Sequence, residues 1–122
     1  NLMVLDGQGD AALLEITAKQ IAVRQSTDGK LFATNHHRSA PLAQKTSCWR
    51  YPIIEKRLRG SGVKLSPKQL TELLDRVSMG EQNLQSMVFF PKSRKLHLAT
   101  GQLPASKGPF IEIPKSALFD PK

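Results

Sequence analysis

The sequence has a single cysteine, few aromatic side chains and no long hydrophobic run. One cysteine, Cys48, excludes an internal disulfide framework and a zinc site built from cysteines. Aromatic residues make up 6% of the chain, so no base-stacking platform for single-stranded nucleic acid is evident. No apolar stretch reaches the length of a membrane-spanning helix. No signal or transit peptide is recognisable either, and the compartment stays undetermined.

Acidic residues are also scarce. The chain has 10 Asp and Glu against 18 Lys and Arg, which gives a net charge of +8. Such a balance invites nucleic acid or an anionic surface as a partner. The basic residues are scattered, however, and form no continuous block. We therefore favour a surface that is solvated or compensated by a partner over a nucleic-acid or membrane-surface role. A basic α+β module that binds nucleic acid or an anionic surface is the alternative function.

The length of 122 residues fits at most one domain, and its pattern predicts an α+β fold. Apolar and alternating runs in the first third predict a meander of four antiparallel strands. Turns rich in Gly and Asp separate them, as at Asp6–Asp10 and Thr27–Lys30. The predicted strands are 2–5, 11–16, 20–25 and 31–35.

The middle third predicts two helices, and the last third returns to strands. Apolar residues recur at helical spacing over 49–58 and again from Leu70 to Val77. The second helix has a strong start, because Ser66 can cap it, Pro67 fits its first turn and Gln69 completes a capping box. The later strands are predicted at 84–90, 95–100 and 110–113, followed by a tail. The sequence therefore predicts one domain with strands within 1–35, helices within 47–80 and strands within 84–113.

The most informative polar residues are Asn35 and Arg50. Asn35 ends the predicted strand after Thr34, where a carboxamide can face a cleft. Arg50 opens the first helix fifteen positions later and can reach the same space. Asn is also frequent at strand ends because its side chain bonds to nearby backbone, and an Arg at a helix start can simply be solvated. The residues alone leave both interpretations open.

Several short motifs, taken in their order and spacing, resemble the C-terminal portion of one enzyme family. That family contains the isopenicillin-N acyltransferases and related peptidases, and it is related to the acid ceramidases and the bile-salt (choloylglycine) hydrolases. Each motif alone is weak, but together they cover nearly all of the chain. The matching pieces are Gly9–Ala12, Leu14–Ile16, Ala33–His36, Arg50–Tyr51, Gln85–Pro91 and Leu98–Gly101.

The resemblance implies an N-terminal-nucleophile hydrolase fold, in which two antiparallel sheets are stacked between helix layers in an αββα sandwich. It also implies self-cleavage that frees an N-terminal Cys, whose α-amino group is the general base for attack on an amide or thioester. By position, Asn35 would stabilise the oxyanion and Arg50 would organise the site. His36 would line the pocket mouth, and Ser86 would support substrate binding. No cofactor is implied.

The cysteine, the histidines and Ser86 could also be candidates for chemistry. Cys48 is internal, so we expect it to fill a gap in the core and not to act as the nucleophile. His36 and His37 are adjacent, and on a strand they would point to opposite faces and could not comfortably bind one metal. We therefore expect no metal site. Ser86 precedes large apolar residues, and from the residues alone we favour a hydroxyl at a strand edge over a second nucleophile.

The chain starts in the middle of a strand-like run, Leu2–Leu5. We expect the chain to be part of a larger precursor whose upstream segment carries the nucleophilic Cys. Its substrate would be a small acyl-amide or acyl-thioester, and a homo-oligomer is left open. The acyl group, the acceptor and the choice between hydrolysis and transfer are not indicated by the sequence.

Overall fold

The computed structural model describes residues 1–43, 46–60 and 62–119. Residues 44, 45, 61 and 120–122 of the predicted domain lie outside this description. The described residues form two three-stranded antiparallel sheets and three helices, so the α+β class is confirmed. The chain divides into two compact units, Asn1–Val63 and Lys64–Lys122. The stacking of the two sheets in one sandwich stays a prediction.

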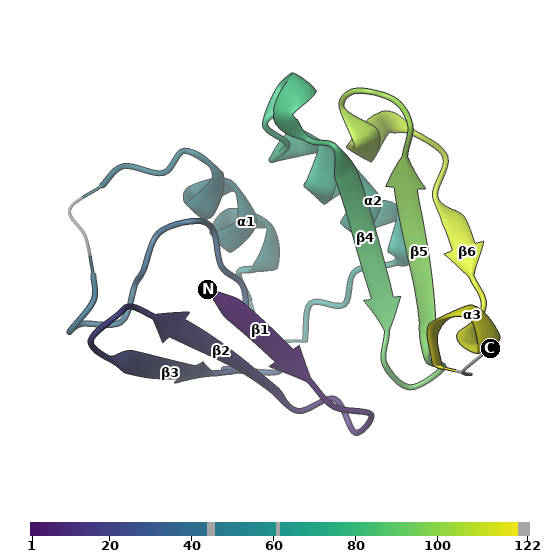
Figure 1. Ribbon diagram of the computed structural model, residues 1–122. Helices are drawn as coiled ribbons and strands as arrows, with labels where there is room; N and C mark the ends of the chain where they lie inside the picture. Colours follow the sequence, from purple (N-terminus) through teal and green to yellow (C-terminus); the bar gives the residue numbers. More distant parts are fainter. Residues whose placement is uncertain (44–45, 61, 120–122) are drawn as a thin grey trace. The chain divides into compact units, whose positions relative to one another are not determined.

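The first unit contains a meander of three strands, β1 (Leu2–Leu5), β2 (Ala11–Ile16) and β3 (Ile21–Gln25), with β2 in the centre (Figure 1). The turn between β1 and β2 is organised by Asp6. Its carboxylate accepts hydrogen bonds from the backbone N–H groups of Gln8, Gly9 and Asp10 at 2.8 to 2.9 Å. These bonds explain why the predicted Gly- and Asp-rich turn forms here.

The predicted fourth strand at residues 31–35 is wrong. The chain makes one isolated bridge between Thr27 and Lys30 and then continues without strand pairing. Phe32 of this segment packs against a helix instead. The ring of Phe32 lies 4.9 Å from that of Tyr51, on the helix α1 (Arg50–Leu58). A short apolar segment can be buried against a helix as well as in a sheet. The hydrophobic periodicity of the sequence does not distinguish these two cases.

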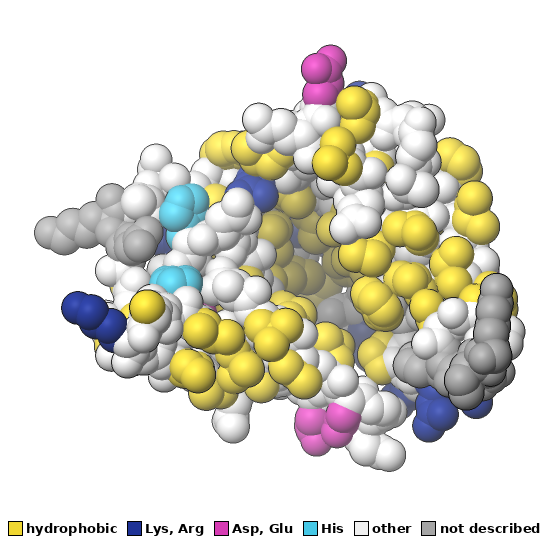
Figure 2. Space-filling model, viewed as in Figure 1, with side chains coloured by type: hydrophobic (Ala, Val, Ile, Leu, Met, Phe, Trp, Pro, Cys, Tyr) yellow, Lys and Arg dark blue, Asp and Glu magenta, His cyan; other side chains and the backbone are white. Residues whose placement is uncertain are grey.

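Sheet β1–β2–β3 has two different faces. Leu13 and Glu15 of β2 point to one face and are almost completely buried. The opposite face is apolar and exposed, as Figure 2 shows for the surface over β1 and β2. Its members include Leu2, Val4, Ile21 and Val23, which are 49 to 62% exposed. Met3 and Leu13, which lie on the same face as Glu15, line the cavity described below.

The second unit packs α2 (Pro67–Arg76) against the sheet β4 (Gln85–Phe90), β5 (Lys95–Thr100) and β6 (Ile111–Ile113) (Figure 1). The predicted capping box is confirmed: Ser66 Oγ accepts from the Gln69 N–H, and Gln69 Oε1 accepts from the Ser66 N–H. Short 3₁₀ turns lie at η1 (Gly80–Gln82) and η2 (Ala105–Lys107). The predicted strands 84–90, 95–100 and 110–113 form to within one residue. A third helix, α3 (Lys115–Phe119), was not foreseen in the tail. The core of this unit consists of Leu73, Val88, Leu96, Ala99 and Ala105.

Candidate functional site

Asn35 and Arg50 line the same cavity. This cavity has a volume of about 530 Å³ and lies within the first unit. Asn35 is exposed at a bend, and Arg50 is half-buried at the first turn of α1. The predicted juxtaposition of these two residues is thus present, although Asn35 follows an unpaired segment and not a strand. The cavity's remaining walls are Asn1, Met3, Leu13, Ala33 and Thr34.

Tyr51 anchors α1 beside the segment that carries Asn35. Its ring packs against Phe32 with centroids 4.9 Å apart, and the Arg38 guanidinium lies 4.1 Å above the same ring. Such aromatic and cation–π contacts each contribute about 0.5–1.5 kcal/mol. They hold the chain on both sides of Asn35, and they place its neighbour Thr34 and the helix residue Arg50 at one cavity.

A buried carboxylate fixes the backbone just after Asn35. Glu15 of β2 accepts hydrogen bonds from the Arg38 N–H at 2.9 Å and from the Ser39 N–H at 2.7 Å. Arg24 of β3 adds an ion pair at 3.3 Å. Burial alone would raise the pKa of Glu15, but the backbone N–H groups of Ser39 and Arg38 outweigh it and lower the pKa to about 2. Glu15 is therefore an anion at neutral pH that ties residues 38 and 39 to the sheet.

The thiol of Cys48 contacts the cavity wall. Its Sγ lies 3.3 Å from the hydroxyl of Thr34, which lines the cavity with Asn35. Burial raises the pKa of Cys48, but hydrogen bonds from Thr34, the Tyr51 N–H and His36 outweigh this effect and lower the pKa to about 6. A thiolate at the start of a helix also benefits from the helix dipole. Sequence reasoning gave Cys48 a packing role only, and the structure adds an ionisable group held against the cavity.

His36 and Ser86, the two predicted substrate-binding residues, lie in different units. His36 follows Asn35 directly and is half-buried, and its Nδ1 has no hydrogen-bond partner among the described residues. Ser86 is buried in the second unit, where its hydroxyl donates to Asn83 Oδ1 at 3.2 Å. The same oxygen accepts from the Ser106 N–H at 2.8 Å. These bonds give Ser86 a local structural role within the second unit.

Sequence reasoning missed the supporting role of Glu15. A signal for it was present, because Glu15 alternates with Leu13 on an otherwise apolar strand and so shares its buried face. A charged side chain at such a position needs partners, which here are backbone N–H groups more than twenty residues away. Nothing local in the sequence indicates which N–H groups these are.

The comparisons with known proteins add no relative. The chain matched no family profile, no curated protein and no solved structure. Within the described part of the chain, no helix is long and apolar enough to cross a membrane. In the same residues, no group of three or more His, Cys, Asp and Glu could hold a metal ion.

Proposed function

We propose that this chain supplies the oxyanion-stabilising part of an amide-bond hydrolase or acyltransferase of the N-terminal-nucleophile class, and not its nucleophile. The observation that carries the proposal is the cavity of about 530 Å³ that Asn35 and Arg50 line together. The motif order that resembles the isopenicillin-N acyltransferase family supports it. Two antiparallel sheets and their helices are also the kinds of element that an αββα sandwich contains.

Asn35 is the proposed oxyanion donor. It is exposed at the cavity, so its carboxamide N–H is free to face a substrate carbonyl. A pre-organised donor of this kind lowers the barrier of acyl transfer by roughly 2.7–4 kcal/mol. The backbone on both sides is held, at Thr34 by the Asn1 side chain and at Arg38 and Ser39 by Glu15. That restraint supports pre-organisation of the donor.

Arg50 is the proposed electrostatic partner. Arg50 lines the same cavity and carries a cationic guanidinium. A fixed positive charge there favours the anionic tetrahedral intermediate and can bind a carboxylate of the substrate. His36 is proposed to border the pocket mouth. Ser86 keeps a proposed supporting role from the resemblance alone, since its described contacts lie within the second unit.

The nucleophile of this proposal is an N-terminal Cys in another segment of the same precursor. Its thiol would attack the acyl carbon while its α-amino group accepts the thiol proton. The C–N or C–S bond would then break as the same proton passes to the leaving amine or thiol, which leaves a thioester acyl-enzyme. The acyl group would finally pass from this thioester to water or to an amine, and the thiol would be regained. The substrate is a small acyl-amide or acyl-thioester, and the reaction needs no cofactor in this account.

Intact mass spectrometry of the complete gene product tests the proposal. We expect two fragments, the downstream one beginning with Cys, and hydrolysis or transfer of an acyl-amide by the processed protein. A single uncleaved chain without acyl turnover would contradict it. Salt-dependent nucleic-acid binding by that inactive protein would favour the alternative basic module. The charge is divided evenly between the two units, with nine basic and five acidic residues in each.

A further inference from the structure

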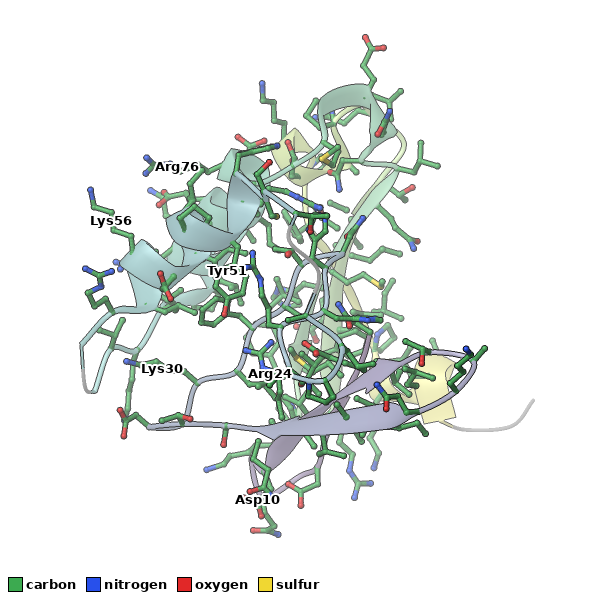
Figure 3. The ribbon with its side chains drawn as sticks, turned by 90° about the vertical axis from the view of Figure 1, so that its left-hand side faces the viewer. Asp10, Arg24, Lys30, Tyr51, Lys56 and Arg76 are labelled. Carbon is green, nitrogen blue, oxygen red and sulfur yellow. The ribbon has the colours of Figure 1, made fainter. Side chains whose placement is uncertain are left out.

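Among the described residues, a second cavity of the first unit is larger than the one at Asn35. It has a volume of about 740 Å³, within the range of small-molecule sites in proteins. Figure 3 shows Arg24, Lys30 and Tyr51 gathered around it, between α1 and the turn that follows β3. Its walls combine apolar and charged side chains. They are Arg24, Gln25, Thr27, Asp28, Lys30, Leu31, Phe32, Tyr51, Glu55, Leu58, Arg59 and Gly60.

From these walls we propose a second binding site, for an amphipathic anion with an apolar body and one terminal carboxylate or phosphate. This site is separate from the proposed oxyanion cavity and does not depend on acyl transfer. The aromatic pair Phe32 and Tyr51, with Leu31 and Leu58, provides the apolar wall. An apolar body packed there would lose its contact with water, which is the main source of affinity for such ligands.

The anionic group is assigned to Lys30 and Arg59. The Lys30 ammonium donates to the backbone carbonyls of Leu58 and Gly60, so its position at the end of α1 is fixed. An ammonium has three donors, and these two bonds leave one for a ligand. Arg59 is exposed at the same cavity, and no ion pair involves it among the described residues.

The other charged groups of the cavity are Asp28 and Glu55, against Arg24, Lys30 and Arg59. Arg24 is paired with Glu15 at 3.3 Å, so the remaining two cations and two carboxylates balance. Preference for an anion therefore rests on the Lys30 donor and the Arg59 guanidinium, and not on the net charge of the cavity. A neutral hydroxyl could accept a hydrogen bond from Lys30 but would gain no charge pairing.

The test is isothermal titration of the 122-residue chain with octanoate, octyl phosphate and 1-octanol. We expect saturable binding of an anion and binding of the alcohol about tenfold weaker, the usual effect of one charge-assisted hydrogen bond. Tighter binding of octyl phosphate assigns the site to phosphates, and tighter binding of octanoate assigns it to carboxylates. Equal affinity for the alcohol, or no binding of either anion, would overturn the proposal.

Two variants and a control complete the test. Lys30→Met and Arg59→Met should each weaken anion binding about tenfold and leave the affinity for the alcohol unchanged. Lys56→Met is the matched control, because Lys56 is exposed on α1, points away from the cavity in Figure 3 and does not line it. Should Lys30→Met unfold the chain, Arg59→Met decides alone, since Arg59 makes no tertiary hydrogen bond among the described residues. Unchanged anion affinity in the folded Arg59 variant would contradict the site.

Discussion

The carboxylate of Glu15 accepts a 2.7 Å hydrogen bond from the backbone N–H of Ser39, twenty-four residues away. This bond joins the centre of sheet β1–β2–β3 to the segment that contains Asn35. The bond explains why this segment keeps a defined backbone conformation although it pairs with no strand. The candidate site therefore depends on a buried anion that does not itself line the cavity.

Replacement of this anion should destabilise the first unit. We predict that Glu15→Gln lowers the free energy of unfolding by about 1–3 kcal/mol, because it leaves backbone N–H groups without full partners. Glu112→Gln is the control, since Glu112 is an exposed carboxylate paired with Lys95 and should change stability by less than about 1 kcal/mol. Urea denaturation of both variants measures the difference. Equal losses of unfolding free energy in the two variants would show that Glu15 stabilises the fold no more than an exposed carboxylate does.

Acid should remove the stability that the ionised Glu15 carboxylate contributes. The folded-state pKa of Glu15 is lowered from 4.5 to about 2, so its contribution is fully present above pH 4.5 and lost as the pH falls toward 2. We predict that the wild-type chain loses stability more steeply than Glu15→Gln between pH 4.5 and 2. Thermal melts across this range provide the measurement. Parallel curves for the two proteins would refute the depressed pKa.

The thiol of Cys48 should react at unusually low pH. We predict that its alkylation by iodoacetamide rises with a midpoint near pH 6, because the thiolate is the reactive form. Thr34→Val removes one hydrogen bond to the sulfur and should move the midpoint toward 9.0, the usual value. The chain has no other cysteine, so the rate reports this site alone. A wild-type midpoint above pH 8 would be incompatible with the described contacts.

The 122-residue chain alone should not turn over acyl-amides or acyl-thioesters. Its only thiol is Cys48, which in our account is not the nucleophile. The control is Cys48→Ser in the complete processed protein, which should retain activity. Turnover by the isolated chain that disappears in Cys48→Ser would identify Cys48 as the nucleophile and would replace the proposed mechanism.

Much of the fold could be predicted from the sequence, because local signals agree with the structure. The capping box at Ser66 and Gln69 forms as its chemistry requires. The Asp6 turn and the alternating strands also form as predicted. The failure at residues 31–35 has a tertiary cause, since Phe32 packs on Tyr51 instead of entering the sheet. The short helix α3 follows Pro114 and has no strong local signal.

The candidate site was predictable only in part. The motif spacing of Asn35 and Arg50 led to two residues that line one cavity. The support from Glu15 could not be located, because its partners are backbone N–H groups of a distant segment. The lowered pKa of the Cys48 thiol could not be predicted for a similar reason. Its lowered pKa depends on contacts with Thr34 and His36, which only the folded chain brings near.

The kinetics of Asn35→Ala in the complete protein test the oxyanion role of Asn35 directly. We predict that kcat for acylation falls by roughly 10²–10³ with little change in KM, because the donor acts on the developing oxyanion and hardly on the ground state. Asn35→Asp should be at least as damaging, since it places a negative charge beside that oxyanion. Thermal melts should match the wild type, because Asn35 is exposed. A near-normal kcat in folded Asn35→Ala would contradict the account.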